Sequence, residues 1–163
     1  MPPNPTRKRK RDTGPPGTGD NEKATLLGFL DYLRSAIADK VAGAPEPQVR
    51  TGGVPSGTNL LGLVKHLTFV ERFYFLGEKI DNWRNTMRAS PEETVDSVLA
   101  GYREAIEQAN KVIEACPDLN DRVPRQGPAL SMRWVLVHMI EETGRHAGHA
   151  DILREQIDGS TGR

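Results

Sequence analysis

Residues 131–158 of the chain read SMRWVLVHMIEETGRHAGHADILREQID. The stretch contains no proline, and its apolar side chains recur every three or four positions, as they do on one face of a helix. These side chains are Trp134, Val135, Val137, Ile140, Ile152, Leu153 and Ile157. We therefore predict a single long helix from Ser131 to Asp158, ended by Gly159.

A polar stripe runs along the same predicted helix. Residues three or four positions apart share a helix face, so His138, Glu142, His146 and His149 fall together. An ordinary solvated face would carry lysine and glutamate, whereas imidazole with carboxylate suits zinc, nickel or non-haem iron. The stripe is thus a candidate metal-binding face.

Helix geometry limits which of these residues can share an ion. His138 and His146 are eight residues apart, which is roughly 12 Å along the axis at ~1.5 Å per residue. One ion cannot reach both. The fourth histidine, His66, lies in another apolar run, where a lone histidine is more often a hydrogen-bonded core residue. Together with residues of the polar stripe, His66 could complete a metal site. Two ligand sets stay open: His66 with His138 and Glu142, or His66 with Glu142 and His146.

Three further segments have helical patterns. Leucine-rich runs predict helices over residues 20–42, with Asp20 as N-cap, and over residues 58–80. The sequence Ser90-Pro-Glu-Glu93 is a capping box with proline at the first helical position, and it predicts a third helix that ends near Ala115. Four amphipathic segments without an alternating strand pattern predict an all-α, up-and-down four-helix bundle.

The first residues of the chain differ in composition from the rest. Residues 1–19 contain five prolines and the basic run RKRKR at positions 7–11. We predict a disordered tail over residues 1–19 and the helical bundle over residues 20–163. The basic run is a candidate contact for nucleic acid, a membrane surface or a targeting receptor, or else it only aids solubility.

Composition argues against several classes of function. The formal net charge is zero, so the whole molecule is not an electrostatic binder of nucleic acid. No apolar run approaches the roughly 20 residues that a membrane helix needs, and no hydrophobic signal segment follows the start. The single cysteine, Cys116, excludes an internal disulfide and fits a reducing compartment. We expect a cytoplasmic protein without a membrane partner.

The chain resembles a known superfamily at these same residues. The segment from Ser131 to Arg154, together with LLGLVKHL at residues 60–67, is similar to the DinB-like superfamily. Within it the chain most resembles an actinobacterial branch that includes mycothiol-dependent S-transferases. The resemblance runs from Asp20 to the C-terminus. It implies a four-helix bundle with a three-residue metal site, and a homodimer.

The resemblance also implies which residues form the site. One histidine of the second helix and two ligands four apart on the last helix correspond to His66, Glu142 and His146. Many relatives have histidine where this chain has Glu142, but the related mycothiol-dependent maleylpyruvate isomerases have glutamate there. His149 would then lie next to the ion, touching a ligand or the substrate, and His138 would become an outer or structural residue.

Basic residues near the site are candidates for contacting an anionic or sugar-bearing substrate. Arg145, Arg154 and Lys65 flank the predicted ligands in the sequence. For Lys65 a solvated helix end is the simpler interpretation. Arg145 is a candidate substrate contact.

The implied activity is that of a metal-dependent thiol S-transferase. Three protein ligands leave an open position on a zinc ion, as in catalytic sites, and the charge of the ion lowers the pKa of a thiol bound there. The expected reaction transfers the metal-bound thiolate of mycothiol, the co-substrate, to a small electrophile in detoxification. Zinc is the first expectation, while nickel, iron and manganese also fit two imidazoles and a carboxylate.

Other functions stay open on the sequence alone. The same site would support a thiol-dependent isomerisation, or hydrolysis by a metal-bound hydroxide. A non-enzymatic, stress-related role would keep the bundle and the ion but turn over no electrophile. Nucleic-acid binding through residues 7–11 would depend on salt and would disappear with the tail.

Overall fold

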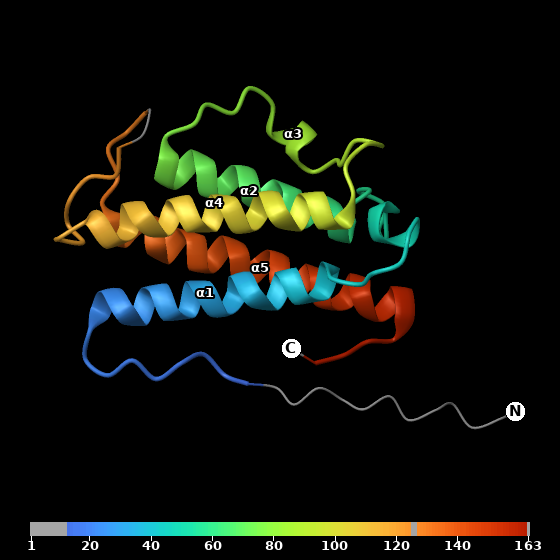
Figure 1. Ribbon diagram of the computed structural model, residues 1–163, viewed down its shortest axis with the longest axis horizontal. Helices are drawn as coiled ribbons and strands as arrows, with labels where there is room; N and C mark the ends of the chain where they lie inside the picture. Colours follow the sequence, from blue (N-terminus) through green and yellow to red (C-terminus); the bar gives the residue numbers. More distant parts are fainter. Residues whose placement is uncertain (1–12, 125–126, 163) are drawn as a thin grey trace, which may run out of the picture.

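Four long helices lie side by side, with loops at both ends (Figure 1). The computed structural model describes residues 13–124 and 127–162. Its helices are α1 (Glu22–Val41), the short 3-10 helix η1 (Gln48–Arg50), α2 (Leu60–Leu76), α3 (Trp83–Thr86), α4 (Val95–Ala115) and α5 (Met132–Asp158). Within the described residues, β-type pairing is limited to one isolated antiparallel bridge between Arg122 and Ser131. The all-α prediction is confirmed for the described residues.

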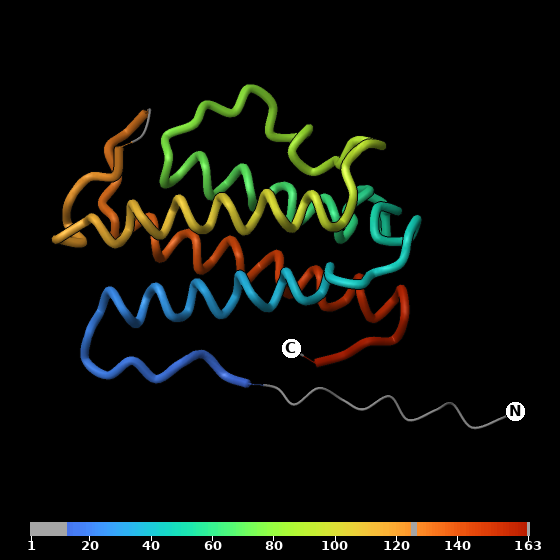
Figure 2. Tube along the Cα trace, in the orientation of Figure 1, coloured from blue at the N-terminus to red at the C-terminus, as the bar shows by residue number. Residues whose placement is uncertain are grey.

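The directions of the helices differ from the predicted up-and-down order. One buried cluster joins the C-terminal halves of α1 and α5 to the N-terminal halves of α2 and α4, through Ile37, Leu153, Leu61 and Val98 among others. Helices α1 and α5 therefore run parallel to each other, and so do α2 and α4 (Figure 1). The up-and-down prediction is wrong because the connection between α2 and α4 returns along the length of α2 (Figure 2).

Two clusters of buried side chains fill the space between the long helices. The cluster just described occupies one end, and the second, which includes Leu30, Phe75, Ile113 and Leu136, occupies the other. Each of α1, α2, α4 and α5 contributes to both clusters. Since full burial of such a side chain contributes roughly 1.5–3 kcal/mol, these contacts hold α2 against α5 in a defined register.

Caps at the helix ends correct two predicted boundaries. Asn21, rather than Asp20, caps α1, because its carboxamide oxygen accepts a backbone N–H of the first turn. Helix α2 ends at Leu76, before the predicted Ile80. There Gly77 takes a left-handed conformation with a φ of 68°, which a residue without a side chain adopts at little cost.

The predicted capping box of the third long helix does not start a helix. The Glu93 carboxylate accepts the Ser90 N–H at 2.6 Å, as expected, but it also accepts Lys65 Nζ at 2.7 Å. Helix α4 begins later, at Val95, where Thr94 and Ser97 form the capping box. The ion pair with α2 shows that Lys65 is not a solvated helix end, which corrects that interpretation.

The single-turn helix α3 was not predicted. The side chain of Asn82 caps it by accepting the backbone N–H groups of Arg84 and Asn85. It lies in the connection over α2, and the ring of Trp83 sits 5.8 Å from the ring of His66 between centroids. A helix of four residues is too short to carry an apolar repeat.

Two further sequence predictions concern membrane-spanning helices and the N-terminal tail. Among the described helices, none is long and apolar enough to cross a membrane. Residues 13–19, the described part of the predicted tail, form no helix or strand. The basic run at positions 7–11 lies outside the described residues.

Candidate metal centre

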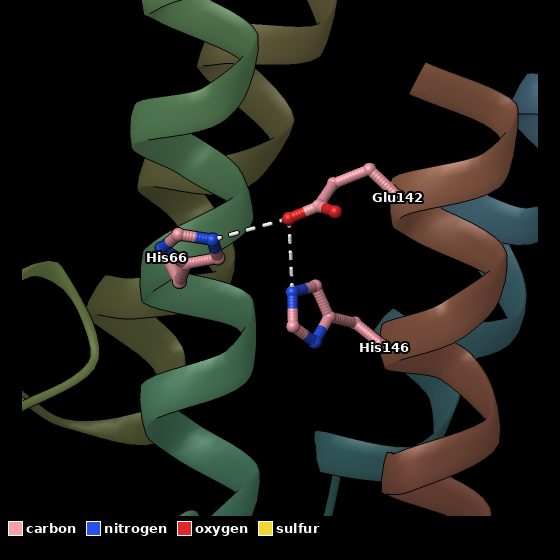
Figure 3. Close-up of side chains that lie close together, drawn as sticks. All are labelled: His66, Glu142 and His146. Carbon is pink, nitrogen blue, oxygen red and sulfur yellow. Dashed lines mark hydrogen bonds and ion pairs between the residues drawn. The ribbon is translucent and has the colours of Figure 1, made fainter. Parts of the chain in front are cut away.

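Helices α2 and α5 bring three of the predicted ligands together (Figure 3). His66 comes from α2, whereas Glu142 and His146 come from successive turns of α5. One ligand atom of each residue lies within 4.8 Å of the others. The side chains are 13%, 16% and 11% exposed, respectively. Of the two ligand sets that helix geometry left open, the structure assembles the one that contains His146.

Glu142 stands between the two imidazoles. Its Oε1 lies 3.4 Å from Nε2 of His66 and 3.1 Å from Nε2 of His146. The two imidazole rings meet edge to face, with 5.2 Å between their centroids. All three ligand atoms therefore face a common point between the helices (Figure 3).

The hydrogen bonds behind His66 determine which of its nitrogens carries the proton. The Thr86 hydroxyl donates to the Trp83 carbonyl oxygen at 2.6 Å. A hydroxyl has one proton, so the same group can only accept from Nδ1 of His66, which lies 2.7 Å away. The Nδ1–H of His66 is thus directed at Thr86, and Nε2 presents a lone pair to Glu142.

This arrangement leaves two acceptors facing each other. The lone pair of His66 Nε2 points at a carboxylate oxygen of Glu142, and an ionised carboxylate has no proton to donate. Polar atoms that are largely withdrawn from water normally find a partner. A divalent cation among the three atoms would give each lone pair a partner. The donor set therefore fits such an ion.

The electrostatics favour the forms that bind metal. Burial lowers the pKa of His66 and of His146, and the neighbouring Glu142 offsets only part of this. Burial acts to raise the pKa of Glu142, but the two histidines outweigh it and hold that pKa below its ordinary value. Near neutral pH the group consists of two neutral imidazoles and one carboxylate, ready for a metal without loss of protons.

His138 lies on the wall of a cavity instead of among the ligands. Its ring stacks on Trp134 with 5.0 Å between centroids, and lies 4.7 Å from the ring of Tyr74. A cavity of about 260 Å³ opens beside the ligands. It is lined by His66, Val70, Tyr74, Trp83, His138 and Glu142. The cavity gives a small molecule access to two of the three ligands.

His149 and Arg145 have different surroundings. Nδ1 of His149 lies 3.4 Å from Nδ1 of His146, so this exposed ring contacts a candidate ligand, and its role beside an ion stays a prediction. Arg145 instead pairs with Glu141 and is 59% exposed. A substrate contact by Arg145 stays a prediction.

Arg154, the remaining basic candidate, binds another part of the fold. Its guanidinium donates to the carbonyl oxygens of Lys40 and Ala42 at 2.7 and 3.0 Å. These carbonyls lie at the C-terminal end of α1. Arg154 therefore ties α5 to α1.

Two residues of the site were not predicted from the sequence. Thr86 orients His66, and Trp83 forms one wall of the cavity. Both belong to α3, whose only signal in the sequence is the capping residue Asn82 after a turn. Nothing in that signal shows that α3 folds back onto α2.

The match with known proteins covers the elements that form the site. A family model described as Mycothiol-S-transferase matches residues 25–159. The matched region runs from within α1 to the glycine that ends α5, and it includes α3 and all three grouped residues. A search of curated proteins found no match. Since the family model covers most of the sequence, the chain belongs to the mycothiol-S-transferase family.

Proposed function

We propose that the chain is a metal-dependent thiol S-transferase built on a DinB-like four-helix bundle. The observation that carries the proposal is the convergence of His66 Nε2, Glu142 Oε1 and His146 Nε2, in which the lone pair of His66 Nε2 faces the Glu142 carboxylate without a proton between them. The family match supports mycothiol as the thiol. Removal of reactive electrophiles in the cytoplasm is the role that such an activity would serve.

The three residues would hold a divalent ion, with zinc as the first candidate. When bound, such an ion lowers the pKa of a thiol at its open position and so favours the nucleophilic thiolate. Glu142 partly balances the charge of the ion, and Thr86 keeps Nε2 of His66 free to bind. The walls formed by Tyr74 and Trp83 hold the electrophile and displace water from it.

The transfer itself needs no redox partner. The sulfur of the thiol forms a bond to the electrophilic carbon, and the leaving group departs with the pair of electrons of the broken bond. The proton of the thiol passes to water. The chain contributes the orientation of the two reactants, which can supply a large part of a rate enhancement.

Metal content tests the site directly. Purified wild type should contain about one divalent ion per chain, as expected for one three-ligand site. His66→Ala, Glu142→Ala and His146→Ala should each lose it, while His138→Ala, which removes a cavity residue of the same helix, should retain it. Retention in His146→Ala together with loss in His138→Ala would move the site by about one turn toward the N-terminus of α5 and contradict the proposal.

The dependence of turnover on a thiol separates the proposed reaction from others of the same site. An S-transferase consumes mycothiol and electrophile in equal amounts. A thiol-dependent isomerase regenerates its thiol, and a hydrolase turns over substrate without one. Tight metal binding without turnover of any electrophile would favour the non-enzymatic alternative.

A further inference from the structure

The cavity beside the candidate ligands has aromatic walls. Tyr74 and Trp83 line it, and so does His138, which stacks on Trp134. The rings of Tyr74 and Trp134 are themselves 6.2 Å apart between centroids, so the aromatic surface continues outward along α5. Flat apolar surfaces of this kind favour a flat ring in offset or edge-to-face contact.

The basic side chains of the described cavity lining are the imidazoles of His66 and His138. This lining includes no lysine or arginine. The three basic residues that flank the candidate ligands in the sequence are engaged elsewhere: Lys65 pairs with Glu93, Arg145 with Glu141, and Arg154 with the end of α1. An anionic group on the side of a substrate that faces away from the candidate ligands would therefore lose hydration without a lysine or arginine of the lining to replace it, which is costly.

The volume sets the size of the occupant. The cavity measures about 260 Å³, and an apolar cavity of about 150 Å³ is large enough to bind benzene. One ring with a short substituent therefore fits within the walls. The reactive carbon of that substituent would point toward Glu142 and His66, the two candidate ligands in the lining.

We propose that this cavity is the electrophile site and that it selects uncharged electrophiles with a flat ring, of the benzylic halide class. The inference rests on the proposed function and specifies its substrate. With benzyl chloride, the thiolate sulfur attacks the benzylic carbon, the carbon–chlorine bond breaks, and chloride leaves with the electron pair. The thiol proton is released to water.

Tryptophan fluorescence measures binding independently of turnover. The chain has two tryptophans: Trp83 lines the cavity, and Trp134 stacks on His138, another lining residue. Titration of the metal-loaded protein with benzyl alcohol, which carries no leaving group, should give a saturable change in fluorescence. Allyl alcohol, which lacks the ring, should give none over the same concentration range.

Variants connect this binding to the cavity walls. Trp83→Ala keeps Trp134 as reporter and should weaken benzyl alcohol binding about tenfold, because stacking area is lost. Tyr74→Leu, a milder change of another aromatic lining residue, should weaken it as well and serves if Trp83→Ala does not fold. Ile152→Ala is the matched control, since Ile152 is an exposed apolar residue of α5 outside the cavity lining. It should bind like wild type.

Turnover of matched chlorides then tests the selectivity. The value of kcat/KM, corrected for the uncatalysed reaction, should be at least about tenfold higher for benzyl chloride than for para-chloromethylbenzoate or allyl chloride. Equal or better use of the carboxylate, or turnover of allyl chloride without any binding of benzyl alcohol, would overturn the selectivity and leave the transferase intact. Saturable, wall-dependent binding with no thiol transfer to any chloride would support the cavity site and overturn the proposed function.

Discussion

Two clusters of ionisable side chains lie between the helices of this protein. They differ in how completely their polar atoms are hydrogen-bonded. Arg34 of α1 donates from Nε and Nη2 to the two carboxylate oxygens of Glu71 on α2, at 2.7 and 2.6 Å. Its Nη1 donates to Asp31 and Asn110 at 2.7 and 2.8 Å. Arg34 is 2% exposed and Glu71 is fully buried, yet every charge has a partner of opposite sign or a hydrogen bond.

In the cluster of His66, Glu142 and His146, by contrast, His66 Nε2 and Glu142 Oε1 face each other as two acceptors, 3.4 Å apart, without a proton between them. Burial acts on both clusters: it raises the pKa of Glu71, and it lowers the pKa of His66. Burial of ionisable groups therefore does not distinguish a functional site from a structural ion pair. The distinguishing feature is whether the group completes its own hydrogen bonds or needs a ligand to do so.

The largest predicted effect is a difference in protein stability between a substitution in the first cluster and one in the second. Glu71→Ala leaves the Arg34 guanidinium buried without its main partner, which should lower the free energy of unfolding by about 3–5 kcal/mol. Glu142→Ala removes a partly exposed carboxylate that faces two neutral imidazoles and no buried cation, and it should change the stability of the metal-free protein far less. Urea denaturation of both variants in the presence of a chelator measures this. Equal destabilisation would mean that Glu142 is paired in the metal-free fold.

Metal linkage is the second test of the comparison. If the ion binds only the folded protein, a free concentration of 100 times Kd should stabilise the wild type by about 2.7 kcal/mol. His146→Ala should lose this gain. Thermal denaturation with added zinc and with a chelator measures the difference. A gain that survives in His146→Ala would place the ion elsewhere in the molecule.

The pattern of the sequence predicts which residues group between α2 and α5 far better than it predicts what surrounds them. Proline-free periodic runs locate the long helices, and the spacing of Glu142 and His146 places both on one face of α5. The two open ligand sets could not be separated by spacing, because His138 is as close to Glu142 in sequence as His146 is. The choice depends on the register of α2 against α5, which the buried clusters set.

The connection between α2 and α4 shows why the remainder could not be predicted. Residues 77–94 have no apolar period, so neither α3 nor the return path along α2 leaves a pattern. The Ser90 capping box failed because Lys65, from another helix, also binds the Glu93 carboxylate. Likewise, Arg34 and Glu71 look like ordinary surface charges of two helices until those helices are packed together.

Thr86 offers a smaller effect at the edge of the candidate site. Thr86→Val removes the acceptor of the His66 Nδ1–H and should weaken metal affinity by about 10–100-fold, the usual loss when a group that orients a metal-bound histidine is removed. Thr86→Ser keeps the hydroxyl and should bind metal like wild type. Competition with a chromogenic chelator measures the affinity. Equal losses in both variants would point to a role in packing alone.

The smallest expected effect concerns Arg145, three residues from Glu142 on α5. Its pairing with Glu141 lies on the exposed side of the helix, and such pairs contribute at most about 1 kcal/mol. Arg145→Ala should therefore change neither metal content nor the stability measurably. The kinetic result is more informative. An unchanged kcat/KM for benzyl chloride would mean that the binding site for the electrophile does not extend beyond the cavity walls. A raised KM for mycothiol alone would instead extend the site along α5, where His149 and Arg145 would contact the thiol while the aromatic cavity holds the electrophile.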